Sequence, residues 1–256
     1  IFFNTILRQW ILFSIFGLLS WFFVSPLVTP YFIIGRGYML GSLLLFTGFY
    51  LLAQKKYTYA ILPITLSVWT VPTFMYTLPL LYCVLLVQSE GRQKIIINLT
   101  GITIVIADFL LYFPILKNIL ASTNLWTTYT FPTFFWDTIH SLSNYSFIPY
   151  GTIPHYLYLF LYIASIRIIC LREKRSIVKR FFVYLNTAIL SYVSVIWILS
   201  LFRLAQPPFM RNGLFIPLII GITITYGATR ITTFHYRCIA WCLLIGNIFF
   251  GINNGD

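Results

Sequence analysis

The sequence predicts an all-α, polytopic membrane protein, and three observations support that fold class. Hydrophobic residues make up 59% of the chain and charged residues only 9%, whereas soluble domains have roughly 25% charged residues. Long apolar runs alternate with short basic clusters, as in a helical membrane protein. The net charge is +12, but the basic residues follow no single solvated face, so we expect no nucleic acid among the partners.

The apolar runs predict about nine membrane-spanning helices, because a span needs roughly 17–25 residues. Pro72 lies between the shorter runs 60–71 and 74–87. The chain either makes a tight turn there between two spans or continues as one long helix with a kink. Together the runs form a single transmembrane domain over residues 1–256. In order along the chain they are 10–24, 38–53, 60–71, 74–87, 95–116, 154–171, 181–202, 214–228 and 239–250.

The distribution of basic residues tests this threading. With a cytoplasmic start and a turn at Pro72, thirteen of the 17 Lys and Arg residues fall on the inner side and four on the outer side. Such an excess is the positive-inside pattern of membrane proteins. A kink at Pro72 would mix the two groups, so the turn is favoured. The long aromatic segment at about 117–153 then becomes an extracytoplasmic loop.

Arg36 is the first candidate for a binding role, because a guanidinium group in apolar surroundings is costly without an anion or an interface. Its planar donors suit phosphate oxygens, and Gly35 and Gly37 beside it allow a bulky ligand to approach. An arginine that extends to the lipid headgroups is the alternative. Tyr38 follows closely and is also typical of the membrane interface.

Two further sets of polar residues are candidates. Asp108 is the only carboxylate inside a predicted span; a buried acid, an ion-pair partner and a proton-relay residue all fit it. Asp137 and His140 share a helix face at the spacing i, i+3 in the outer loop, and serve either as a base with its orienting partner or as surface polar residues. Arg211 adds a further cation on the predicted outer side.

Three segments resemble membrane glycosyltransferases of the GT-C fold, in particular the bacterial family-39 branch related to protein O-mannosyltransferases and aminoarabinose transferases. The first combines Ser25-Pro26-Leu27 with Gly35-Arg36-Gly37-Tyr38, where the family usually has alanine at the position of Gly35. The second runs from Trp69 to Leu80 and the third from Pro207 to Leu218. They follow the family's order along most of the chain.

The resemblance implies an enzyme of the bacterial plasma membrane that transfers a sugar from a polyprenyl-phosphate donor to an acceptor at the extracytoplasmic face. The sequence has no motif for a cofactor and no metal-spaced His/Cys cluster, so we expect neither group, and the metal dependence of the reaction stays open. The resemblance implies that Arg36, Tyr38 and Arg211 contact the lipid phosphate, and it makes Asp137 and His140 candidates for donor or acceptor binding. The family's catalytic acid lies in an early outer loop. This sequence has no acidic residue before Glu90, so we expect a fragment that lacks the amino-terminal spans and the catalytic acid.

Two other functions stay open on the sequence. A transporter or flippase for a lipid-linked sugar needs the same outer cation and aromatic lining. A non-catalytic assembly subunit of the membrane is the third possibility.

Overall fold

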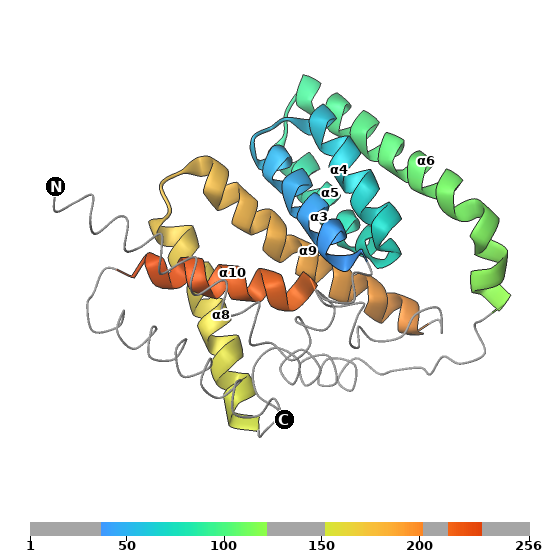
Figure 1. Ribbon diagram of the computed structural model, residues 1–256. Helices are drawn as coiled ribbons and strands as arrows, with labels where there is room; N and C mark the ends of the chain where they lie inside the picture. Colours follow the sequence, from blue (N-terminus) through green and yellow to red (C-terminus); the bar gives the residue numbers. More distant parts are fainter. Residues whose placement is uncertain (1–36, 122–151, 202–214, 232–256) are drawn as a thin grey trace. The chain divides into compact units, whose positions relative to one another are not determined.

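The computed structural model describes residues 37–121, 152–201 and 215–231, and these residues are helical, with no strand among them (Figure 1). They belong to two compact units. One unit contains α3 (Tyr38–Ala53), α4 (Tyr57–Thr70), the 3-10 helix η1 (Pro72–Thr77), α5 (Leu78–Gln88), α6 (Arg92–Ala121) and most of α9 (Ser176–Leu201). The other contains α8 (Thr152–Arg172), the beginning of α9 and α10 (Phe215–Thr229). The predicted all-α class is confirmed for the described residues.

Helices α3 and α4 form a tight antiparallel hairpin, because two glycines of α3 let the backbones approach closely. A Cβ atom on Gly48 would lie 2.5 Å from Cγ1 of Ile64, and one on Gly41 would lie 2.9 Å from Cγ2 of Val71. Small residues are the usual means of close helix contact in membrane proteins. The connecting turn contains Lys55, whose positive φ of 64° closes the reversal.

The chain reverses again between α4 and α5, so the predicted turn at Pro72 is confirmed and the single kinked helix is excluded. Pro72 occupies the start of η1, where its missing N–H is tolerated. Two contacts with helix α9 show the direction of α5. Tyr184 hydrogen-bonds to Gln88 near the end of α5 at 3.2 Å, whereas Ser191 donates to the carbonyl of Tyr76 at 2.8 Å, before α5 begins.

Among the residues that the structure describes, two helices are long and apolar enough to cross a membrane, as judged by length and composition: Arg92–Leu111 within α6 and Ser176–Leu199 within α9. The segments Leu40–Ala53, Pro72–Gln88 and Leu218–Thr229 are also apolar but shorter. One side of α6 exposes a row of large apolar side chains that includes Leu99 (60% exposed) and Phe109 (56% exposed). Such a surface suits lipid and is unusual in a soluble monomer.

The helix boundaries agree with the predicted spans within a few residues, with informative exceptions. The predicted span 38–53 has the bounds of α3. Helix α9 begins at Ser176 and not at residue 181, since Lys179 and Arg180 are good helix formers that an apolar-run criterion leaves out. The same holds for α6, which begins at Arg92. The predicted spans 10–24 and 239–250 lie outside the described residues.

Candidate functional site

Of the residues predicted to contact the donor or the acceptor, only Tyr38 lies in the part of the chain that the structure describes. Arg36, Asp137, His140 and Arg211 lie outside the described residues. Tyr38 is the first residue of α3 and is half-buried. Gly37 caps the helix with a φ of 77°, a left-handed conformation that favours glycine.

The beginning of α3 packs directly on the end of α4. A Cβ atom on Gly37 would lie 2.8 Å from Cγ2 of Thr70, and a Cβ on Gly41 would lie 3.2 Å from the ring of Phe74 in η1. Gly37 and Thr70 are therefore neighbours in space, although more than thirty residues separate them along the chain. They belong to two of the three segments that resemble the family.

A buried tyrosine and a half-buried one lie near this same end of the unit. Tyr192 of α9 is fully buried, and its ring centroid lies 6.1 Å from that of Tyr76. Tyr38, the first residue of α3, lies within electrostatic range of Tyr192. Tyr38 therefore has two other tyrosines, Tyr76 and Tyr192, near it at this end of the unit.

Asp108 of α6 is held by a partner that the sequence did not identify. The Trp69 side chain, on α4, hydrogen-bonds to the Asp108 carboxyl group. The second oxygen, Oδ1, is shielded from solvent and accepts no hydrogen bond. The sequence predicted Asp108 as a candidate, because it is the single carboxylate inside a predicted span. Nothing in the sequence predicted its contact with Trp69.

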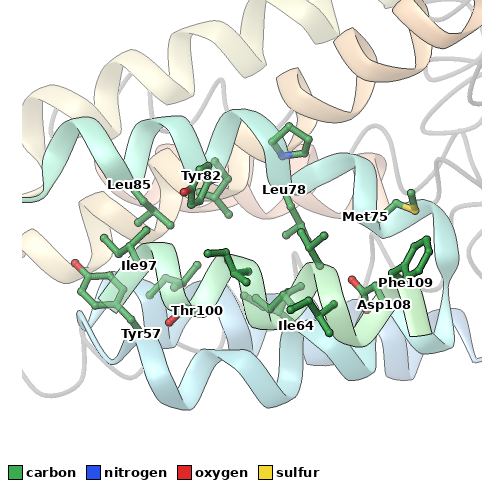
Figure 2. Close-up of a pocket in the computed structure, with 18 residues that line it drawn as sticks. Tyr57, Ile64, Met75, Leu78, Tyr82, Leu85, Ile97, Thr100, Asp108 and Phe109 are labelled. Atoms are coloured by element: carbon green, nitrogen blue, oxygen red, sulfur yellow. The ribbon is translucent and has the colours of Figure 1, made fainter. Parts of the chain in front are cut away.

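Asp108 lies at one end of an apolar cavity of about 630 Å³ between α4, α5 and α6 (Figure 2). Met75 and Phe109 flank the same end, while Tyr57, Leu85 and Ile97 lie at the opposite end. Eighteen residues line the cavity, and Asp108 is the only charged one among them. Met75 and Phe109 are also exposed, so the cavity opens at the surface of the unit.

The other unit contains a second polar centre, around Glu173, which was not predicted from the sequence. The Glu173 side chain is 1% exposed and pairs with Arg230 at 2.5 Å and with Arg175 at 3.2 Å. The Tyr226 hydroxyl donates a hydrogen bond to the same carboxylate. The signal in the sequence was a lone carboxylate within the basic run Arg172–Arg175.

Burial raises the pKa of Glu173, but the opposing effects are together larger. Hydrogen bonds from Tyr226 and Arg175 and the positive charge of Arg230 lower the pKa to about 2. The carboxylate is therefore charged at neutral pH. Its ion pairs with Arg175 and Arg230 connect the end of α8 to the end of α10. We therefore interpret Glu173 as a structural residue at the basic end of this unit.

Comparison with known proteins adds no relative: no protein-family model, curated protein or solved structure matches the chain. Within the described ranges, no group of three or more His, Cys, Asp or Glu side chains is placed to hold a metal ion.

Proposed function

We propose that the chain belongs to a GT-C-like glycosyltransferase of the bacterial plasma membrane with about nine spans, which transfers a sugar from a polyprenyl-phosphate donor at the extracytoplasmic face. The contact between Gly37 and Thr70 carries this proposal. It brings together two segments that resemble the family at separate places in the sequence. Because α3 and α4 form an antiparallel hairpin, both segments lie at the same end of the unit, where one binding site can use residues from each.

The phosphate contact of the proposed site would lie next to Gly37. Arg36 directly precedes Gly37 in the chain. Its guanidinium group would bind the phosphate of the bound donor and would also stabilise that phosphate as the leaving group when the sugar is transferred. Tyr38 would donate a hydrogen bond to the same phosphate, and Arg211 would add a second positive charge. Asp137 and His140 would bind the sugar or the acceptor. The catalytic acid is not assigned to a residue of this chain.

A lipid-linked sugar flippase is the alternative that a specific observation favours. The cavity between α4, α5 and α6 is almost entirely apolar and opens at the surface of the unit. A cavity of this kind suits passage of a lipid chain as well as its binding. The two functions differ in whether the sugar leaves its phosphate.

The test is a sugar-transfer assay on membranes that contain the full-length protein, with a panel of radiolabelled polyprenyl-phosphate sugars. We expect one donor to lose its sugar to an endogenous acceptor. Arg36→Ala should lower this transfer by about 100-fold or more, in line with the loss of a charge-assisted contact of about 3 kcal/mol. Arg36→Lys should retain part of the activity, because it keeps the charge but not the planar fork.

Arg92→Ala is the matched control, since Arg92 is an exposed arginine at the beginning of α6, at the opposite end of the unit from Gly37. It should leave transfer unchanged. Immunoblots measure the abundance of each variant. If Arg36→Ala reduces only abundance, and transfer per molecule stays the same, the protein is an assembly subunit and the proposal is wrong.

A further inference from the structure

We propose that the cavity between α4, α5 and α6 is a binding site for a single-chain lipid amine, with the apolar chain along the cavity and the ammonium group on Asp108. The site stands on two observations that are independent of each other: the shape and lining of the cavity, and the unpartnered oxygen of Asp108. It is also independent of the proposed sugar transfer, because it uses neither Arg36 nor the outer loop.

The cavity fits an apolar chain. Its volume of about 630 Å³ lies within the range of roughly 300–1,000 Å³ that is usual for small-molecule sites. Buried side chains such as Ile64, Leu81 and Ile104 line it. A methylene chain that replaces water or disordered lipid there gains contact on three helices.

Asp108 supplies the single charge at one end of this apolar space. Trp69 fixes one side of the carboxyl group through its hydrogen bond, which leaves Oδ1 shielded and unpartnered. A buried acceptor without a donor is costly. The ion pairs present in the described part of the chain are both made by Glu173, so no described side chain neutralises Asp108.

The chemistry of the missing partner follows from the carboxylate. An ammonium group supplies three donors and the opposite charge, so it satisfies Oδ1 and neutralises the carboxylate together. An alcohol supplies a hydrogen bond only. A fatty acid places a second negative charge beside the first and is repelled. The expected order of affinity is therefore amine, then alcohol, then alkane and acid.

The test uses the full chain in nanodiscs of zwitterionic lipid, so that no anionic lipid attracts the probe. Saturable binding of radiolabelled dodecylamine is measured against empty nanodiscs, with dodecanol, dodecane and dodecanoic acid as competitors. We expect dodecylamine to bind at least about tenfold more tightly than dodecanol, as for a hydrogen bond that gains charge assistance. Equal affinity for all four probes would mean that bulk lipid fills the cavity, and the proposal would be overturned.

Paired variants locate the site. Asp108→Asn should weaken amine binding by about tenfold or more and leave dodecanol binding nearly unchanged. Glu90→Gln is its control, since it removes an exposed carboxylate that does not line the cavity. Ile104→Phe should fill the cavity and weaken both probes, while Leu110→Phe, on the exposed side of the same helix, should weaken neither. Unchanged amine binding in Asp108→Asn contradicts the assignment, and the probe series on the wild-type protein decides the matter if a variant does not fold.

Discussion

At the scale of single residues, buried charges hold helix ends together through their ion pairs, and Glu173 is the clearest case. It is the only acidic residue in the run Arg172–Arg175, and its side chain is almost completely covered. Two arginines and a tyrosine surround it. Removal of the carboxylate leaves cationic groups close together without their shared partner, which is the costly way to break a buried ion pair.

We expect Glu173→Gln to lower the free energy of unfolding by about 1.5–3 kcal/mol at pH 7, the usual range for hydrogen bonds to a charged group. The sign of the pH dependence follows from the lowered pKa. The charged form of Glu173 stabilises the fold fully above the unfolded-state pKa of roughly 4.3. This contribution is lost as the pH falls toward the folded-state pKa of about 2.

The measurement is the thermal midpoint of wild type and Glu173→Gln in the same detergent between pH 8 and pH 2. The difference between the two proteins should stay constant down to about pH 5 and then disappear as Glu173 takes up its proton. Glu90→Gln, an exposed acid, should match wild type throughout. A difference between wild type and Glu173→Gln that persists at pH 2 would show that the glutamate acts through its shape and not through its charge.

At this scale the sequence predicted which residues are unusual but not their partners. Asp108 is conspicuous because it is the one carboxylate inside an apolar run. Its contact with Trp69 depends on how α4 packs against α6, and helix packing of this kind leaves no periodic signal in the sequence. Tyr38 was predicted as a site residue; it lies at the start of α3, within electrostatic range of Tyr192, and its phosphate contact stays a prediction.

At the scale of elements, the α3–α4 hairpin depends on the close approach that glycine permits. We expect Gly48→Val to destabilise the protein by about 1–3 kcal/mol, the usual cost of overpacking, because its Cβ would lie 2.5 Å from Ile64. The measurement is again the thermal midpoint in detergent. Ile64→Ala combined with Gly48→Val should recover part of the loss, since the smaller side chain makes room.

The control for this prediction is Gly101→Ala, whose Cβ would meet the ring of Tyr82 at 3.0 Å and not a branched side chain held by two helices. It should cost less than Gly48→Val. If the double variant is no more stable than Gly48→Val alone, the close contact between the helices is not the source of the effect.

Elements were easier to predict than partners, because apolar runs and prolines act locally. The bounds of α3 and the reversal at Pro72 follow from the sequence. The start of α5 does not: residues 74–77 were expected in a span but lie in η1, where the backbone is wound more tightly after Pro72. Arg92 and Lys179 were expected outside the helices, yet they extend α6 and α9 at their amino-terminal ends.

At the scale of the whole molecule, several basic residues of the described part lie close together within each unit. The side chain of Arg180 donates to the carbonyl of Ala53 at 2.9 Å, next to the turn that contains Lys55 and Lys56. Arg175 and Arg230 meet in the same way in the other unit. We therefore expect these ends to face the cytoplasm.

Single cysteines in a protein whose native cysteines have been replaced test this orientation. Lys56→Cys and Lys174→Cys should react with a membrane-impermeant maleimide only after the cells are lysed, since both positions are exposed on the expected inner side. Ser122→Cys, in the predicted outer loop, should react in intact cells. The reverse pattern would invert the topology and remove Arg36 from the outer face.

The most direct test of the proposed function follows one donor in proteoliposomes that contain the wild-type full-length protein. The assay measures, in the same sample, the sugar transferred to an acceptor and the polyprenyl-phosphate donor that changes leaflet. A glycosyltransferase should release sugar from its lipid phosphate in an amount that grows with protein and time. Donor that changes leaflet with its sugar still attached, and no transfer to any acceptor, would identify a flippase and contradict the proposal.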